Sequence, residues 1–204
     1  MTKKLIVVPE KVRKSATIDL GAIPVNTYQK SIQEELSGKS GLSMERLLRI
    51  YRDMAVIREF ETMLDSIKKL GAYQSISYTH AGPAHLSIGQ EGAAVGQSVH
   101  LGVVDHMFGS HRSHGEIIAK GLRAVEDLAG NGLLTVMENY FDGAALRIVQ
   151  SNSPDWTGLT LTPKGKKNPV LATPEEEELG VDFLLYGLLA EIFGRETGFN
   201  KGMG

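Results

Sequence analysis

The chain has 204 residues, of which 42% are hydrophobic and 23% charged, so it is long and apolar enough for one globular domain with appendages. Its formal net charge of −2, without a basic cluster interleaved with aromatic residues, argues against nucleic acid as the main partner. The absence of cysteine excludes disulfides, thiolate catalysis and cysteine metal sites, and the lack of a signal peptide or a membrane-length apolar segment predicts a cytoplasmic protein that does not enter a membrane.

Residues 1–42 are expected to form an extended arm that docks or wraps. Short β-prone runs at 5–8 and 17–20 alternate with prolines and glycines, and one short helix is predicted within 28–36. Residues 43–204 are expected to form the main domain.

A long helix is predicted from Ser43 to Gly71. Ser43 can cap the free amides at its start, and Glu45 suits the positive end of the helix dipole. Apolar residues recur at helical spacing throughout the segment, at Leu47, Ile50, Tyr51, Met54, Ile57, Phe60, Leu64 and Ile67.

Four shorter elements are predicted between Gly71 and Gly121. Residues 71–83 are rich in aromatic and β-branched residues, which indicates a loop or short strand. A helix of small residues is expected at 90–100, where glycines permit close packing. Residues 103–108 are predicted to form a strand that presents 110–114 at its end, and Ser113 is expected to cap a short helix that stops at Gly121.

The remaining segments predict more helix and one long loop. Residues 122–149 have helical periodicity interrupted by two glycines, so two helices are as consistent with the pattern as one. Residues 151–172 are expected to form a loop, and Thr173, Pro174 and Glu176 form the pattern of a capping box at the start of a final helix.

Five of the six histidines lie between His85 and Gly121, together with an arginine and two glycine-punctuated helix starts. Ring nitrogens, a guanidinium and small residues on short turns are suited to holding an anionic cofactor against the backbone. This segment is therefore predicted to carry the functional site.

Four motifs, in this order, resemble a known family: YRDMAVIREFE, HLSIGQEGAAVG, DHMFGSHRSHGEIIAKG and LLAEIFGRETGFNKGMG. They are similar to the α-type portion of the thiamine diphosphate-dependent first component of 2-oxo acid dehydrogenase complexes, and most similar to versions in which the α and β portions are fused. The resemblance covers most of 43–121 and 179–204. It implies an α/β fold, mostly helical, that forms the leading part of a thiamine diphosphate-binding fold with a short parallel sheet.

The resemblance also implies roles for individual residues. His111 and Arg112 match a pair that binds the cofactor's diphosphate, and a guanidinium fork with an adjacent ring nitrogen suits that task. His85 matches a histidine near the reacting end of the cofactor and is the expected catalytic residue. Gln90 and His114 complete the expected cofactor-binding set: Gln90, like Glu91, can accept from free amides at the next helix start, and His114 can steady the same loop.

By this resemblance the intact enzyme decarboxylates a 2-oxo acid and passes the acyl group to a lipoyl carrier. The implied partners are a β-type portion of the same enzyme, a lipoyl acyltransferase component and further copies of the chain in a homo-oligomer. The family's magnesium-binding segment has no match here, because the only Asp–Gly pair, Asp142–Gly143, lacks the surrounding motif. Magnesium ligands are therefore expected outside this chain, which is interpreted as an amino-terminal part that is inactive alone.

Two other interpretations remain open. His111 and His114, with His80, His85 and His106 nearby in sequence, suit a transition-metal site, although no carboxylate or cysteine set completes a familiar ligand pattern. The second alternative is a non-catalytic interaction fragment or truncated product whose apolar faces bind a missing half or a second copy.

Arg58 and Glu59 are interpreted as ion-pairing scaffold and not as part of a site.

Overall fold

The computed structural model describes residues 21, 30–38, 42–80, 82, 85–130, 132–152 and 174–203. The runs expected at 5–8 and 17–20, and residues 153–173 with the expected loop and Thr173, lie outside the described residues. The chain divides into two units between Leu42 and Ser43.

In the first unit, the short helix predicted within 28–36 is present as α2 (Ile32–Ser37). It begins there because Ser31 and Glu34 form a reciprocal capping box. The Ser31 hydroxyl accepts from the Glu34 amide, and the Glu34 carboxylate accepts from the Ser31 amide at 2.6 Å.

The second unit begins with α3 (Met44–Leu70), which confirms the predicted long helix. The Ser43 hydroxyl accepts from the Arg46 amide at 3.1 Å, and Gly71 ends the helix in the left-handed conformation. A hairpin of two short antiparallel strands follows, β1 (Ala72–Tyr73) and β2 (Ile76–Ser77), where the sequence predicted a loop or short strand.

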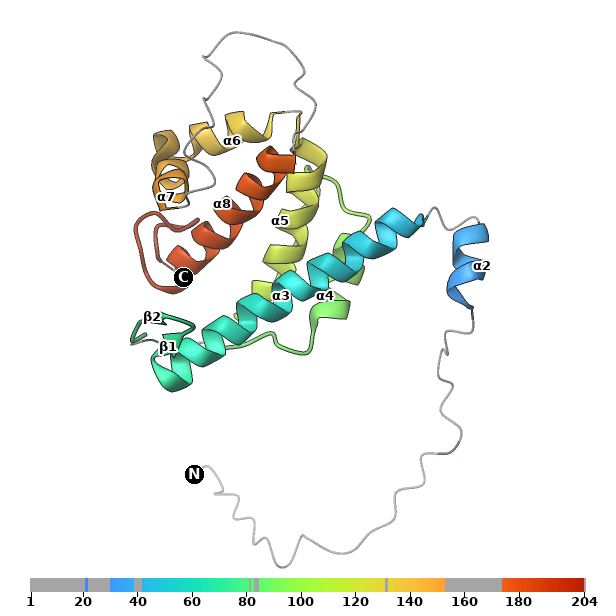
Figure 1. Ribbon diagram of the computed structural model, residues 1–204, viewed down its shortest axis with the longest axis horizontal. Coiled ribbons are helices and arrows are strands. Elements are labelled where there is room, and N and C mark those ends of the chain that lie inside the picture. The colour runs from blue at the N-terminus through green and yellow to red at the C-terminus, as the bar shows by residue number, and fades with distance from the viewer. Residues whose placement is uncertain are drawn as a thin grey trace, which may run out of the picture. The chain divides into compact units, whose positions relative to one another are not determined.

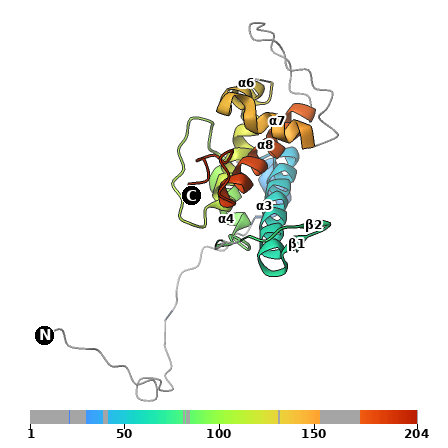
Figure 2. The same cartoon turned by 90° about the vertical axis from the view of Figure 1, so that its left-hand side faces the viewer.

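The other helices of this unit are α4 (Glu91–Ser98), α5 (His114–Leu128), α6 (Leu133–Asn139), a 3-10 turn η1 (Tyr140–Gly143), α7 (Ala144–Asn152) and α8 (Pro174–Ile192). Figure 1 shows α5 between α8 and the pair α3 and α4, all of which it contacts. In Figure 2 the short helices α6 and α7 lie together beside α8, at the opposite end of the unit from the β1–β2 hairpin. Residues 122–149 thus form several short helical segments rather than one or two helices.

The strand predicted at 103–108 is wrong. These residues form a turn followed by an irregular segment, in which the Asp105 carboxylate accepts from the Gly102 amide at 2.6 Å and the Asp105 amide donates to the Gly102 carbonyl. Asp105 thereby forms hydrogen bonds with the backbone three residues earlier, and the segment does not pair with any strand that the structure describes. Among the described residues the only sheet is the antiparallel hairpin, so the structure does not show the expected parallel sheet.

The helix expected to stop at Gly121 continues to Leu128. A Cβ atom at Gly121 would lie 2.4 Å from Leu184 Cδ1 of α8. This glycine is therefore a contact point between two packed helices and not a terminator. Gly187 of α8 is also a close contact point, in this case with the turn segment after α8, because a Cβ atom there would lie 2.4 Å from the ring of Phe199.

Gly187→Ala is expected to destabilise the chain by about 1–3 kcal/mol relative to Gly96→Ala, because the added methyl overpacks against a ring already held by Tyr140 and Phe183. Gly96 of α4 is a matched control, since a Cβ atom there meets nothing within 4 Å. Both substitutions gain the same helix propensity, so the difference isolates the packing cost. Urea unfolding of both variants measures it, and equal midpoints would contradict the close approach of Gly187 to Phe199.

One apolar core joins the helices of the second unit. Its fully buried apolar side chains are Ile57, Leu64, Ile118, Leu122, Met137, Leu146 and Leu179. Helix α8 contributes further buried residues, including Phe183, Leu184 and Leu188, so its apolar side chains are covered by the other helices. Within the described ranges, no helix has both the length and the apolar character required to span a bilayer.

Candidate functional site

Two short segments bring three of the predicted site residues together. Residues 85–90 lead into α4, and the turn 111–113 leads into α5. The rings of His85 and His111 meet edge to face, with their centroids 5.0 Å apart, and both side chains are exposed. Arg112 follows in the same turn, is also exposed, and has no ion-pair partner among the described residues.

Ser87 connects the two segments. It is only 1% exposed, and its hydroxyl donates a short hydrogen bond to the carbonyl of Arg112. The turn itself is closed by serines: the Ser113 hydroxyl donates to the Ser110 carbonyl, and the Arg112 amide donates to the Ser110 hydroxyl at 3.2 Å. Side-chain hydrogen bonds to local backbone thus determine where Arg112 sits.

Glu61 of α3 lies beneath both segments and is completely buried. Its Oε2 atom accepts from the Ser87 amide at 2.7 Å, and its Oε1 atom lies 3.2 Å from Nδ1 of His114. That second contact has ion-pair distance but not hydrogen-bond alignment. His114 therefore faces the Glu61 carboxylate and is mostly covered, unlike the exposed His111, and its expected role beside the cofactor stays a prediction.

Glu91, the first residue of α4, holds the other end of the loop. Its carboxylate accepts two hydrogen bonds from Arg58, at 2.6 and 2.9 Å, and one from the Gly89 amide at 2.9 Å. The hydrogen bonds from Arg58, helped by the Gly89 amide, lower the pKa of Glu91 to about 2, against the opposing effect of burial. Arg58 is thus the predicted ion-pairing scaffold.

Gln90 corrects one expectation. It occupies the cap position of α4, but its side chain makes no capping hydrogen bond and is exposed. Glu91, whose carboxylate reaches back to Gly89, performs the amide-binding role expected of the pair. The local reason is that the Gln90 backbone does not adopt the extended conformation typical of a capping residue.

The remaining histidines do not join this group. His80 packs against the ring of Phe193, with centroids 5.0 Å apart, and His106 is exposed in the segment after the Gly102 turn. In the part of the chain that the structure describes, no group of three or more His, Cys, Asp or Glu is placed to hold a metal ion. The structure thus provides no support for the histidine metal-site alternative.

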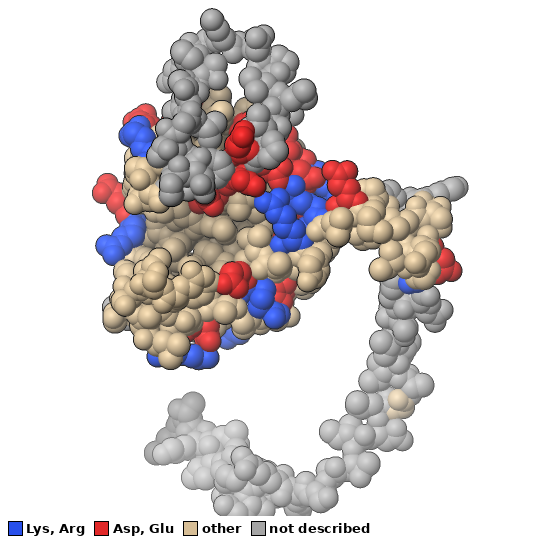
Figure 3. Space-filling model, viewed as in Figure 1, with Lys and Arg blue, Asp and Glu red and all other residues tan. Residues whose placement is uncertain are grey.

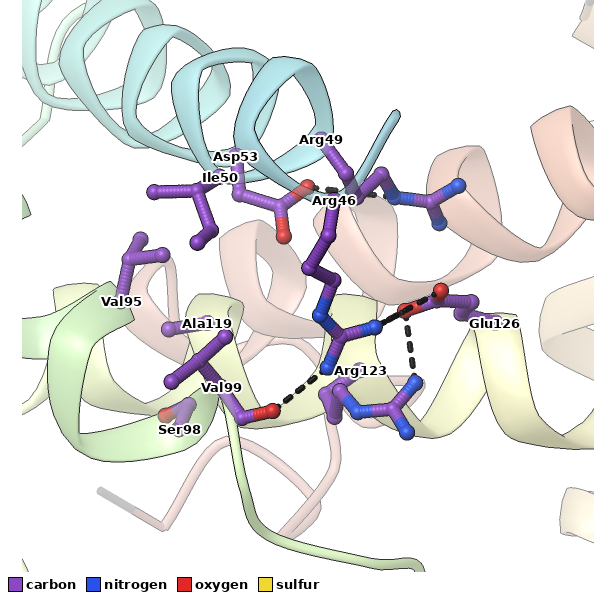
Figure 4. A pocket seen from close by; sticks show the side chains of 10 residues that line it. All are labelled: Arg46, Arg49, Ile50, Asp53, Val95, Ser98, Val99, Ala119, Arg123 and Glu126. Atoms are coloured by element: carbon purple, nitrogen blue, oxygen red, sulfur yellow. Dashed lines mark hydrogen bonds and ion pairs between the residues drawn. The ribbon is translucent and has the colours of Figure 1, made fainter. Parts of the chain in front are cut away.

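A separate small cavity, lined by both charged and apolar side chains, lies between α3, α4 and α5 (Figure 4). Its volume of about 10 Å³ is that of a site for one water molecule. Burial raises the pKa of Asp53 in its wall to about 6, against the lowering effect of Arg49 and Arg52.

Basic and acidic side chains are interspersed on the face of the molecule seen in Figure 3. Two of these pairs are Arg46 with Glu126 and Arg49 with Glu177.

Several curated proteins are similar to this chain. It is 29% identical over 113 residues to the pyruvate dehydrogenase E1 component subunit alpha of Saccharomyces cerevisiae, an alignment that covers 55% of this chain and 25% of the yeast protein. It is 32% identical over 114 residues to the corresponding subunit of Rhizobium meliloti, covering 55% and 30% of the two chains. It is 39% identical over 84 residues to the alpha subunit of acetoin:2,6-dichlorophenolindophenol oxidoreductase of Cupriavidus necator, covering 41% and 23%.

The chain is similar to parts of these α subunits. The finding confirms the resemblance seen in the four motifs. The chain spans about a quarter of the length of the yeast and Cupriavidus necator proteins that it matches. No model of a protein family matches the chain, and no solved structure matches it. The thiamine diphosphate-binding fold therefore stays a prediction.

The residue missed by sequence reasoning is Glu61. A signal was present, because Glu61 lies among Ile57, Phe60 and Leu64 on the apolar side of α3. A carboxylate at a core-facing helical position requires polar partners from another segment. Those partners, Ser87 and His114, are 26 and 53 positions away and could not be identified from spacing.

Proposed function

We propose that this chain supplies the diphosphate-binding side of a thiamine diphosphate-dependent first component of a 2-oxo acid dehydrogenase complex. The observation that carries the proposal is the meeting of His85 with the His111–Arg112 turn at the surface. The similarity to α subunits of pyruvate dehydrogenase E1 components supports it from an independent direction.

The exposed side chains fit the anionic end of the cofactor. Arg112 has a free fork of N–H donors and no carboxylate partner among the described residues, and His111 adds a ring nitrogen beside it. A diphosphate provides the acceptor oxygens that these donors require. When bound, thiamine diphosphate supplies the electron sink for decarboxylation of a 2-oxo acid.

His85 has a different role in this proposal. Its ring is held next to His111 but belongs to the other segment, so it can donate to the carboxylate or carbonyl oxygen of the 2-oxo acid while Arg112 and His111 bind the diphosphate. We assign it the catalytic role. Gln90, exposed at the end of the same loop, is the remaining candidate for a contact with the cofactor.

The further parts of the enzyme follow from the family resemblance. They are a β-type portion, a lipoyl acyltransferase that receives the acyl group, magnesium ligands from outside this chain and assembly as a homo-oligomer in the cytoplasm. Turnover is assigned to the assembled enzyme and not to the 204 residues alone.

Titration of the full chain with thiamine diphosphate, inorganic diphosphate or thiamine tests the proposal, with histidine ring resonances as the readout. We expect the two phosphorylated compounds to shift His85 and His111, with His106 as an internal control that stays in place. Binding is expected to be weak, with a free energy of about −4 kcal/mol that corresponds to a millimolar dissociation constant. Equal shifts with thiamine, or none with diphosphate, would contradict the proposal.

A further inference from the structure

Glu61 is a fully buried carboxylate whose contacts are with Ser87 and His114 and not with the exposed side chains of His85, His111 and Arg112. Taking a carboxylate out of water is costly, and an apolar residue of similar size often serves stability at least as well. Its neighbours Ile57, Phe60 and Leu64 are apolar core residues of the same helix. Stability therefore does not account for a carboxylate at this position.

The contacts of the carboxylate indicate what it does. One oxygen accepts from the Ser87 amide, two residues after His85, and the other faces His114, two residues after Arg112. A single rigid group thus contacts both segments that carry the exposed site. The two oxygens of a carboxylate share one plane at a fixed separation, so these contacts constrain the distance between the segments.

The link is reinforced next to Glu61. The Ser87 hydroxyl donates to the carbonyl of Arg112, and a Cβ atom at Gly115 would lie 3.6 Å from Ser87 Cβ and 3.4 Å from Ala94 Cβ. The small residues allow the loop to approach the start of α5 closely. The Arg58–Glu91 pair holds only the far end of the loop and does not contact the turn that carries Arg112.

We propose that Glu61 is a positioning residue whose carboxylate, through Ser87 and His114, sets the separation of His85 from His111 and Arg112. The inference rests on the proposed function only in assigning a ligand to those three side chains. The arrangement itself can be measured without ligand.

Nuclear magnetic resonance of the full chain, free of ligand, tests the inference with Glu61→Gln. We expect the dipolar contact between the His85 and His111 rings to be lost and exchange of the Ser87 amide to accelerate at least about tenfold. Glu59→Gln is the matched control, because Glu59 is exposed on the same helix and contacts the Tyr73 hydroxyl instead. The Ile118 amide is the internal reference, since a general loss of stability would accelerate both amides alike.

An unchanged ring contact in Glu61→Gln, or equal acceleration at Ser87 and Ile118, would overturn the inference. If Glu61→Gln does not fold, His114→Gln breaks the link from the other side: we expect the ring contact to be lost while the Ser87 amide stays protected, and retention of the contact would overturn the inference. Failure of the wild-type chain to bind diphosphate would contradict the proposed function alone, because the ring contact is measured in its absence.

Discussion

Arg112→Ala is expected to weaken binding of thiamine diphosphate and of inorganic diphosphate by about 10- to 100-fold. The substitution removes charge-assisted hydrogen bonds worth about 1.5–3 kcal/mol, and each 1.4 kcal/mol corresponds to about tenfold in affinity. Arg112 is exposed and its fixed backbone position comes from Ser87 and Ser110, so the fold should survive the change. Titration followed by the histidine resonances compares the dissociation constants of the variant and the wild type.

Two further variants separate charge from geometry at this position. Arg112→Lys keeps the charge but not the planar fork, so we expect it to restore only part of the affinity. Arg147→Ala is the control, because Arg147 is also exposed but donates to the Asp142 carbonyl near α7. Diphosphate binding by Arg112→Ala at wild-type strength would remove Arg112 from the site.

His85→Ala is expected to distinguish the substrate-binding role of His85 from the diphosphate-binding role of Arg112. Because His85 is assigned to the substrate, its loss should leave diphosphate affinity nearly unchanged and lower kcat of the assembled enzyme. Arg112→Ala should instead raise the cofactor concentration that the enzyme requires.

Glu91→Gln is expected to lower the free energy of unfolding by about 1–3 kcal/mol at pH 7, because the variant loses the charged bonds from Arg58 and the depressed pKa that they maintain. The upper limit is reduced by solvent screening, since the Arg58 side chain is 54% exposed. The folded-state pKa of about 2 lies below the ordinary value of 4.5 for a glutamate, so this stabilisation is present above pH 4.5 and is lost as the pH falls toward 2. Denaturant unfolding at pH 7, 5 and 4 should show the difference between wild type and variant narrowing at the acidic end.

Asp53→Asn is a control in which the change in folding stability with pH is expected to have the opposite sign. Burial raises the folded-state pKa of Asp53 from 3.8 to about 6, so the unfolded chain loses its proton first as the pH rises. The charge therefore destabilises the folded chain increasingly between about pH 4 and 6, and we expect the variant to gain stability relative to wild type over that range. A Glu91→Gln effect that does not change with pH would show that the carboxylate's charge is not what holds the loop.

Local chemistry was sufficient to predict the best-defined elements. Helix α3 could be predicted because its apolar period is reinforced by Ser43 and Gly71, whose effects act over one turn. Helix α5 begins after Ser113 as predicted, but the expected cap is wrong, because the Ser113 hydroxyl bonds to the Ser110 carbonyl instead of a helix amide. Helix α8 begins at Pro174, as the position of the proline predicted. The motifs also selected His85, His111 and Arg112, which the structure brings to one surface.

Errors arose where one residue type has two uses. Gly121 resembles a helix terminator in sequence, yet it lies inside α5 because α8 packs against it. Residues 103–108 have the apolar character of a strand, but Asp105 bonds to Gly102 and turns the chain. The packing of Gly121 depends on a distant element and cannot be seen from spacing, whereas the Asp105 turn is a local bond that outweighs the apolar pattern.

The residue pattern alone was enough to establish the family resemblance, the long helix and the choice of His85, His111 and Arg112 as candidate site residues, because these depend on short-range order and on motifs that can be compared directly. The position of those side chains relative to one another came from the folded chain. Glu61 shows the reason: a buried carboxylate finds its polar partners wherever the packed helices bring them, and here the Ser87 amide comes from the loop before α4 and His114 from the start of α5. Contacts of this kind join segments far apart in sequence, so they form only when α3, α4 and α5 pack around a common core.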